Sequence, residues 1–372
     1  MINTPQRLVH VPPGVQCFVG DEARRRRRIE ETVVQAFEGW DYEEIIPPLY
    51  DYAEVFAGPA LSPKTYSFVG RDGSVLALRP DFTSLLAKVT AGRLRDRPAP
   101  IRLYYSGEVL RYEPPKAGRQ SELHQMGLEH LGGERSAADA EVLAIAAECL
   151  DRLGARSWVL AVGHVGVFSG LLAGSGLGAD ALESLRERVE GKDAGGVREV
   201  LERSQVAPEA ARAVMRLTEL AGEATVLEEA ARAFAFSPAA RAAVAELTLV
   251  VEALRAAGLG DRLAVDLGEV RGLDYYTGLV FRAYAPGLGF EVGGGGRYDT
   301  LLERFGRPMP AVGFMFGLDR LSLLLERQGV LPAAAPLPAE AVQGPALGEA
   351  LARARARRSA GARVRFGDGG GR

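Results

Sequence analysis

The chain has 372 residues, of which 47% are hydrophobic, and its formal net charge is −3. This length predicts two domains or one large core with an insertion, and the acidic balance excludes a bulk attraction for a polyanion such as RNA. The chain has two cysteines, four histidines and no apolar run long enough to span a membrane, so we expect a reduced, cytoplasmic protein with no membrane partner, disulfide framework, metal or cofactor.

The first fifty residues predict an arm, a helix and a short strand. Residues 1–20 are rich in proline and glycine, and Asp21 is a candidate N-cap for a helix that ends near Trp40. Five consecutive arginines, residues 24–28, lie in this helix, and we interpret them as its solvated face rather than as a binding patch. Residues 42–49 predict a strand at a sheet edge or an interface, because its paired prolines cannot donate to a central ladder.

A hairpin and a second helix are predicted next. Residues 66–78 form two short strands around the turn sequence Gly-Arg-Asp-Gly, and an apolar helix follows at residues 85–89. Asp81 and Thr83 precede this helix. They could cap it, or their oxygen atoms could line a pocket wall and bind an ammonium group.

Two longer strands, residues 101–111 and 121–131, are predicted on either side of a basic loop that contains proline and glycine. Such a pair of strands would suit a nucleotide, with Arg111 on a phosphate and the loop on a base, since arginine makes bidentate phosphate contacts. Ordinary surface charge is the alternative interpretation.

The middle of the chain is predicted to be helical. Residues 136–139 resemble a capping box that opens a helix ending near Leu153. From about residue 170 to residue 257 the sequence is rich in Ala, Glu, Arg and Leu, which indicates a block of several helices inserted between two β-rich halves. His164 has no partner at ligand spacing, so we expect it in the core or on the surface.

Residues 269–299 are the most informative stretch of the sequence, because they combine predicted strands with a run of four glycines. Apolar strands are predicted at residues 263–267, 279–284 and 290–292, and four glycines follow at residues 293–296. Four glycines at a strand end predict backbone passing close to a ligand, or positive φ angles, although a plain glycine-rich hairpin is the alternative. Residues 297–304 are predicted to open a helix.

Residues 311–325 predict a strand or turn and then an apolar helix, on which Arg320 could reach a phosphate or simply be exposed. Beyond residue 330 we expect one helix at residues 347–358 and one strand at residues 362–366. A segment of this size cannot build the core of an α/β domain alone, so we expect it to be flexible or a remnant.

Five segments together resemble the catalytic core of histidyl-tRNA synthetases. In chain order they are residues 78–83 (LRPDFT), 104–129, 271–278 (RGLDYYTG), 294–299 (GGGRYD) and 311–321 (AVGFMFGLDRL). The resemblance implies an α+β class II aminoacyl-tRNA synthetase-like core, in which an antiparallel sheet is flanked by helices. It divides the chain into a first core half (1–165), a helical insertion (166–258), a second core half (259–330) and a short tail without an anticodon-binding domain (331–372).

The resemblance also implies two sets of site residues. The residues that would line a histidine pocket are Asp81, Thr83, Arg111, Gln125, Glu129, Arg271, Tyr275 and Tyr276. Gln125 and Glu129 stand where the synthetase holds the amino group and the imidazole ring. The residues of a vestigial ATP site would be Arg111, Glu113 and Arg320.

Three departures from the synthetase pattern point to a related family. Residues 79–83 are Arg-Pro-Asp-Phe-Thr instead of Arg-Pro-Glu-Gly-Thr, the loop at residues 113–116 lacks the arginine of Glu-Arg-Pro-Gln, and the tail replaces the anticodon-binding domain. The regulatory subunits of ATP phosphoribosyltransferase typically show Arg-Pro-Asp-hydrophobic-Thr and lack that domain. The whole chain, tail included, is similar to that family.

Members of the regulatory family make no product of their own. They assemble with a short-form catalytic subunit that condenses ATP with phosphoribosyl pyrophosphate, the first step of histidine biosynthesis, and they are needed for feedback inhibition by histidine. The resemblance therefore implies a regulatory subunit with no catalytic residues, a homodimer within a hetero-oligomer, histidine as a possible effector and no tRNA partner. The alternatives are a truncated histidyl-tRNA synthetase-like enzyme that activates histidine with ATP, and an interaction protein of stress signalling.

Overall fold

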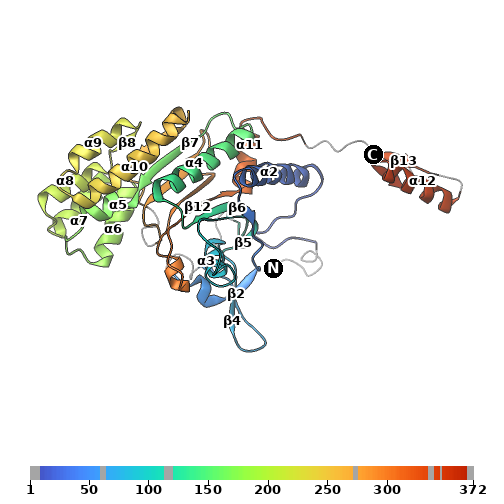
Figure 1. Cartoon of the computed structure of the whole chain (residues 1–372), viewed down its shortest axis with the longest axis horizontal. Coiled ribbons are helices and arrows are strands. Elements are labelled where there is room, and N and C mark those ends of the chain that lie inside the picture. The colour runs from blue at the N-terminus through green and yellow to red at the C-terminus, as the bar shows by residue number, and fades with distance from the viewer. Residues whose placement is uncertain are drawn as a thin grey trace. The chain divides into compact units, whose positions relative to one another are not determined.

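The structure is a computed structural model, and it describes residues 9–58, 64–112, 120–270, 275–333, 339–343 and 346–366. The chain forms two compact units (Figure 1). One consists of Met1–Cys17 with Arg26–Leu331, and the other consists of Phe18–Arg25 with Pro332–Arg372. The two units are described separately below.

The larger unit is built on one mixed sheet. Its strands, in spatial order, are β1 (Glu43–Glu44), β5 (Ile101–Leu110), β6 (Glu122–Leu131), β12 (Ala311–Gly317), β11 (Gly293–Arg297), β10 (Leu279–Tyr284), β7 (Val159–His164), β9 (Leu263–Asp266) and β8 (Ala221–Gly222). The pairs from β5 to β7 are antiparallel, whereas β1 with β5 and β7 with β9 are parallel. The predicted antiparallel sheet is confirmed, and β1 lies at its edge as the paired prolines predict.

Helices cover one face of this sheet (Figure 1). They are α2 (Gly20–Gly39), α4 (Arg135–Arg152) and α11 (Leu318–Arg327). Alternate strand residues such as Phe281, Phe314 and Phe316 point toward the helices and join their apolar residues in the main core. The opposite face carries a smaller core around α3 (Thr83–Ala91), with the polar side chains of the candidate site beside it.

A separate three-stranded sheet contains the predicted hairpin. Its order is β2 (Tyr50–Tyr52), β4 (Val75–Leu78) and β3 (Ser67–Val69), all antiparallel. A 3₁₀ helix, η1 (Ala53–Phe56), follows β2 and packs against α3.

The predicted helical block is present between β7 and β9 (Figure 1). Its helices are α5 (Val165–Leu171), α6 (Ala179–Glu190), α7 (Ala194–Arg203), α8 (Pro208–Arg216), α9 (Thr225–Ala233) and α10 (Pro238–Ala256), and the short η3 (Gly260–Arg262) precedes β9. Within the block, β8 pairs with β9 and adds an edge strand to the sheet, which the composition did not predict. His164 is buried, as one of the two expectations had it, and caps α5 through a hydrogen bond from the backbone amide of Gly166.

The capping residue of α4 differs from the prediction. The Glu134 carboxylate, and not the Ser136 hydroxyl, accepts the backbone N–H groups of Ser136 and Ala137, at 3.2 and 2.8 Å. The helix therefore begins one residue before Ser136. A glutamate can serve here because its carboxylate reaches two amides of the first turn, where the helix dipole also favours negative charge.

The four glycines are themselves a strand, whereas the prediction placed them after a strand at residues 290–292. They belong to β11, and positive φ angles are absent from all four. A Cβ atom on Gly295 would overlap the carbonyl oxygen of Gly313 and lie 2.6 Å from the Cα atom of Phe314. Glycine is needed because β10 and β12 crowd this strand. The helix predicted to open at residue 297 is only the 3₁₀ turn η4 (Leu302–Phe305).

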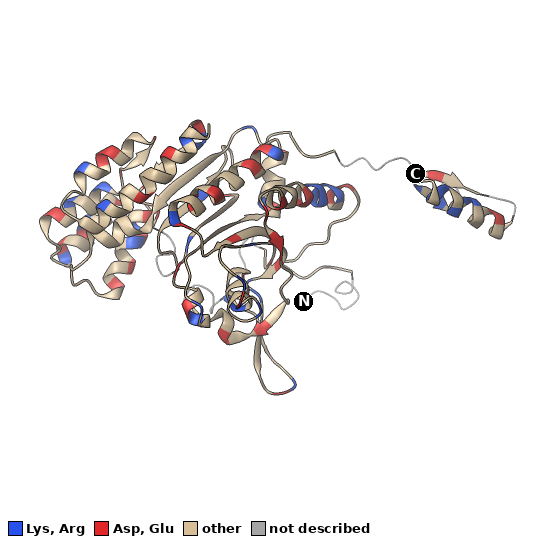
Figure 2. Cartoon of the chain, in the orientation of Figure 1, with Lys and Arg blue, Asp and Glu red and all other residues tan. Residues whose placement is uncertain are grey.

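The five consecutive arginines form a basic run on α2 (Figure 2), and their side chains are not equally exposed. Arg27 and Arg28 are exposed, as predicted. Arg26 is largely buried and forms an ion pair with Asp319 on α11 at 2.5 Å, so that part of the prediction is wrong. The arginine run thus contributes a contact within the larger unit.

The smaller unit contains a β–α–β segment. β13 (Glu340–Val342) and β14 (Val364–Phe366) pair in parallel, and α12 (Leu347–Ser359) connects them. The predicted helix and last strand are confirmed. β13 was not predicted, because three residues are too few to show the alternation of polar and apolar side chains that is typical of a strand. Throughout the described parts of the chain, each helix is too short or too polar to cross a lipid bilayer.

Candidate functional site

The sheet face opposite α4 gathers most of the predicted pocket residues. Gln125 and Glu129 are four residues apart on β6, so both side chains point to this face, and both are buried. Thr83 reaches the same place from the first turn of α3. Arg271 and Glu113, two further predicted site residues, lie outside the described residues.

Glu129 is the centre of this cluster and is only 2% exposed. Its carboxyl accepts a hydrogen bond from the Thr83 hydroxyl at 2.8 Å and another from the Tyr298 hydroxyl. Burial raises the pKa of Glu129 to about 8, although both hydroxyl groups lower it. Burial therefore favours the neutral carboxyl, whereas a cationic or hydrogen-bond-donating ligand would favour its ionised form.

The strand opposite Glu129 leaves room for its carboxyl. Gly313 pairs with Glu129 across β12 and β6. A Cβ atom on Gly313 would overlap the Glu129 carboxylate and lie 2.5 Å from the carbonyl oxygen of Leu128. The glycine is thus required by the position of the buried acid.

Asp81 and Thr83 were predicted either to cap the helix or to line a pocket, and the structure gives one of these roles to each residue. The Asp81 carboxylate accepts the backbone N–H of Ser84 at 2.9 Å and so caps α3. Thr83 instead faces Glu129. Burial raises the pKa of Asp81, which lies beside the same cluster. Arg111 donates to the carbonyl oxygen of Pro80 at 2.7 Å and supports the segment that leads into α3.

Three tyrosines form an aromatic wall beside Glu129. The ring of Tyr275 stacks on that of Tyr298 with centroids 5.3 Å apart, and it meets Tyr276 edge-on at 5.1 Å. Burial raises the pKa of Tyr276 to about 12, so its hydroxyl remains a hydrogen-bond donor. Tyr298 was missed as a site residue, although it lies in the GGGRYD segment that carried part of the resemblance.

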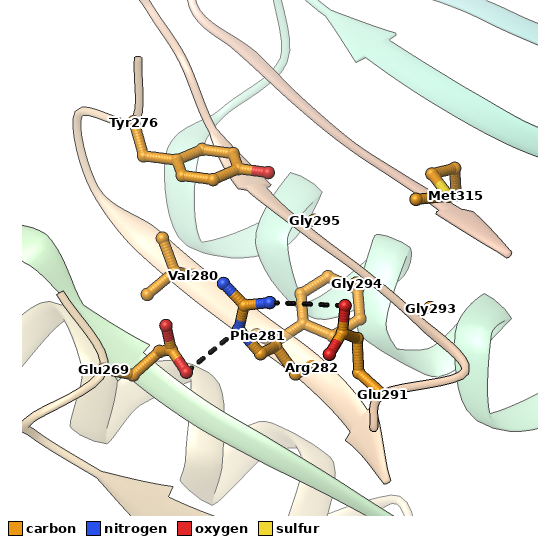
Figure 3. Close-up of a pocket in the computed structure, with 10 residues that line it drawn as sticks. All are labelled: Glu269, Tyr276, Val280, Phe281, Arg282, Glu291, Gly293, Gly294, Gly295 and Met315. Carbon is orange, nitrogen blue, oxygen red and sulfur yellow. Dashed lines mark ion pairs between the residues drawn. The ribbon is translucent and has the colours of Figure 1, made fainter. Parts of the chain in front are cut away.

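An adjoining cavity of about 110 Å³ lies on the sheet face over β10 and β11 (Figure 3). Its lining residues are Glu269, Tyr276, Val280, Phe281, Arg282, Glu291, Gly293, Gly294, Gly295 and Met315. The volume exceeds what a single water molecule needs and suits a small ligand. Tyr276 belongs to both the cavity and the predicted histidine pocket. The charged lining was missed, and the one available signal was Arg282 inside an apolar strand.

Arg320 is held by Glu291, which is a residue of the cavity wall. Its guanidinium donates to the Glu291 carboxylate at 2.7 Å and to the Glu291 carbonyl oxygen at 2.8 Å. Arg320 is therefore engaged within the protein, and its role toward ATP stays a prediction.

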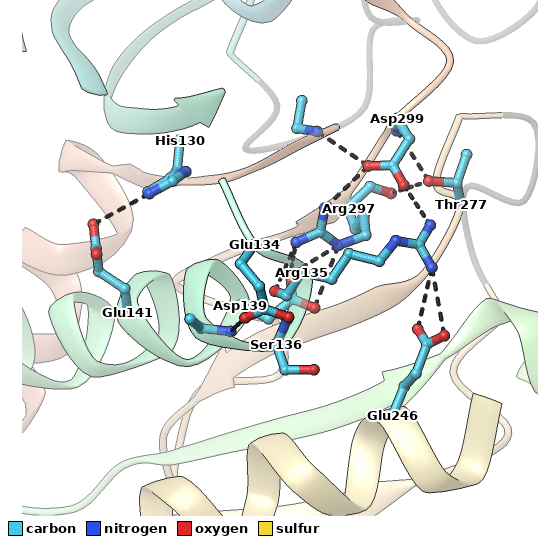
Figure 4. Close-up of polar contacts among 12 residues, drawn as sticks. His130, Glu134, Arg135, Ser136, Asp139, Glu141, Glu246, Thr277, Arg297 and Asp299 are labelled. Atoms are coloured by element: carbon cyan, nitrogen blue, oxygen red, sulfur yellow. Dashed lines mark hydrogen bonds and ion pairs between the residues drawn. The ribbon is translucent and has the colours of Figure 1, made fainter. Parts of the chain in front are cut away.

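An ion-pair network with a buried centre lies where the last residue of β11, Arg297, meets α4 (Figure 4). Arg297 is 1% exposed, and its guanidinium donates to Asp139 at 2.7 Å and to Asp299 at 3.0 Å. Asp299 also forms an ion pair with Arg135, which contacts Glu246 of α10. Since Tyr298 stands between Arg297 and Asp299 in the chain, the network fixes the backbone that presents its hydroxyl to Glu129.

The side chains around Glu129 are suited to binding a small ligand. Buried carboxyl, hydroxyl and amide groups converge beside an aromatic wall, which suits a small ring with hydrogen-bonding nitrogen atoms. Within the described residues there is no group of three His, Cys, Asp or Glu side chains placed to hold a metal ion.

Comparison with known proteins gives two consistent results. A family model described as histidyl-tRNA synthetase matches residues 14–321. The ATP phosphoribosyltransferase regulatory subunit of Moorella thermoacetica is 40% identical over 365 residues, which cover 97% of this chain and 92% of its own length. That of Desulforamulus reducens is 39% identical over 90% of this chain and 83% of its own length.

Solved structures agree with the sequence comparisons. A Bacillus halodurans protein described as an ATP phosphoribosyltransferase regulatory subunit/histidyl-tRNA synthetase has a TM-score of 0.86 and 29% identity, covering 98% of this chain and 94% of that chain. A histidyl-tRNA synthetase from a Nostoc species has a TM-score of 0.80 at 24% identity, covering 98% of this chain and 87% of that chain, a likeness of fold.

Proposed function

The chain belongs to the family of ATP phosphoribosyltransferase regulatory subunits, and from this premise we propose that it is the non-catalytic regulatory subunit of that enzyme in histidine biosynthesis. The observation that carries the proposal is the match over 97% of this chain and 92% of a named regulatory subunit. The histidyl-tRNA synthetase fold is compatible with this proposal but does not distinguish a regulatory subunit from a synthetase, since the fold fits both classes of protein.

The partner would be a short-form catalytic subunit, which performs the condensation of ATP with phosphoribosyl pyrophosphate. The subunit would act with it in the cytoplasm, and tRNA would not be a partner, because the chain carries a net charge of −3. Size-exclusion chromatography of the mixed subunits with light scattering tests the assembly. Elution of the two chains as separate species at micromolar concentrations would contradict it.

Within this assembly we propose a homodimer. Large apolar side chains are exposed on and around the sheet-edge strand β1 and the three-stranded sheet: Ile46, Leu49, Tyr50, Tyr52, Phe68, Val69 and Val75. Ile46 is 84% exposed and Val69 is 72% exposed, which is costly unless a partner covers them. The chain alone should then elute at twice its 39.7 kDa.

The effector would be L-histidine, bound in the cluster around Glu129. A buried carboxyl with a pKa of about 8 can exchange a proton or a hydrogen bond with an imidazole ring, and the three tyrosines provide stacking surface. Occupancy would inhibit the enzyme only by the difference in histidine affinity between the active and inactive states of the assembly.

Glu129→Gln should weaken histidine binding by about ten- to one-hundred-fold, because the amide keeps the shape of the side chain but cannot ionise. Isothermal titration calorimetry of the complex with L-histidine measures the effect. Glu252→Gln, at an exposed position on α10, is the matched control and should bind as the unmodified protein does. Unchanged affinity in Glu129→Gln would contradict the effector site and leave a scaffold role.

The second candidate function is a histidine-activating enzyme related to histidyl-tRNA synthetases. The match of that family model to residues 14–321 and the presence of Arg111 and Arg320 favour it. Histidine-dependent exchange between ATP and pyrophosphate, catalysed by the chain alone, would support this enzyme over the regulatory subunit.

A further inference from the structure

Three charged side chains, Glu269, Arg282 and Glu291, line the cavity on the sheet face over β10 and β11 (Figure 3). Arg320 contacts Glu291 from beside the cavity and completes an alternating row of four charges. The Glu269 carboxylate lies 3.0 Å from the guanidinium of Arg282, which in turn lies 3.7 Å from the Glu291 carboxylate. The other neighbour of Glu291 is Arg320, at 2.7 Å. Both guanidinium groups therefore face a carboxylate that belongs to the protein.

Glu291 is the shared member of this row. It contacts both arginines, and its side chain is 24% exposed. Burial alone would raise the pKa of Glu291, but the hydrogen bond from Arg320, a backbone hydrogen bond and the positive charges of Arg320 and Arg282 together hold the pKa below its ordinary value. Glu291 thus carries its negative charge at neutral pH.

A phosphate chain is normally recognised by guanidinium groups that are available for bidentate contacts. Here an incoming polyphosphate would have to displace Glu291 from Arg320 and then remain beside the Glu291 and Glu269 carboxylates. Like charges repel strongly in a partly buried site, where the effective dielectric constant is below that of water. The row of charges therefore opposes such a ligand.

We propose that Glu291 is a built-in counter-ion that makes this cavity reject polyphosphate ligands such as nucleoside triphosphates. The inference rests on the proposed function and deepens it, because it names a class of ligand that this cavity of the regulatory subunit excludes. Glu291 is in this sense a specificity-determining residue. Its removal should expose Arg320 and Arg282 as an anion site.

The test is calorimetric titration of the full chain with inorganic tripolyphosphate and, separately, with ATP. Glu291→Gln should bind both probes at least about tenfold more tightly than the unmodified chain. Adding Arg320→Ala to Glu291→Gln should abolish most of the gain, because Arg320 receives the phosphate. Glu252→Gln, which removes an exposed charge on α10, should leave the affinity unchanged.

Equal affinity of the unmodified chain and Glu291→Gln would overturn the proposal, and so would a gain that survives Arg320→Ala. If Glu291→Gln fails to fold, as judged by near-ultraviolet circular dichroism, Glu291→Asp replaces it. That variant withdraws the carboxylate by one methylene group and should give a smaller gain of the same sign; no gain would overturn the proposal. Because the titration uses the chain alone, its failure is distinguishable from a failure to activate the catalytic subunit.

Discussion

Arg297→Ala is expected to lower the free energy of unfolding of the larger unit by about 3 to 5 kcal/mol. The substitution removes a guanidinium that is 1% exposed and leaves the Asp139 carboxylate, 2.7 Å away, buried without its partner. Breaking one side of a buried ion pair costs more than the pair itself contributes, because the remaining charge stays desolvated. Urea denaturation followed by circular dichroism measures the loss.

The loss in Arg297→Ala should also depend on pH. Burial raises the pKa of Asp139 to about 6 even beside Arg297, and without the arginine the pKa would rise further. The carboxyl can then take up a proton, so the deficit should be smaller at pH 5 than at pH 8. Arg297→Lys, which keeps the charge but not the planar fork, should give an intermediate loss.

Arg203→Ala is the matched control for Arg297→Ala. Arg203 pairs with Glu199 at 4.0 Å, and both side chains are about two-thirds exposed. Exposed pairs contribute about 0 to 1 kcal/mol, so this variant should unfold almost as the unmodified protein does. If Arg297→Ala lost no more than Arg203→Ala, the network would not hold the site.

Gly295→Ala is expected to destabilise the sheet by about 3 kcal/mol. The added methyl group would overlap the backbone of β12, which can yield only if the strand pairing opens. Gly289→Ala is the control, since its methyl group would meet no atom within 4 Å and its φ is not positive. Thermal unfolding of both variants decides the matter. An unaffected Gly295→Ala would show that packing against β12 does not require glycine at this position.

The sequence predicts much of this fold because its signals are local. Alternating strands such as β5 and β6, the hairpin turn between β3 and β4, and the alanine-rich block can each be recognised within a short window. The order of the five segments that resemble histidyl-tRNA synthetases then predicts the arrangement of these elements in one sheet flanked by helices. The pocket residues Gln125 and Glu129 follow from the same motifs and lie on one face, as the strand period requires.

The errors arise where the cause lies far away in the chain. Packing was not predicted as a reason for the glycines of β11, because the crowding residues, Gly313 and Phe314, belong to another strand. Arg297 carries no local sign of burial, since its partner Asp139 is 158 residues away. The contact between Glu291 and Arg320 joins residues 29 apart. Such pairings emerge only once the strands are assembled.

The most direct test of the account is the rate of phosphoribosyl-ATP formation by a short-form catalytic subunit, measured with and without this chain. We expect the rate to rise by about tenfold or more, to saturate at a fixed ratio of the two subunits, and to fall again when L-histidine is added. An unchanged rate, with no co-elution of the two chains and with histidine-dependent ATP–pyrophosphate exchange by this chain alone, would contradict the account and identify a histidine-activating enzyme.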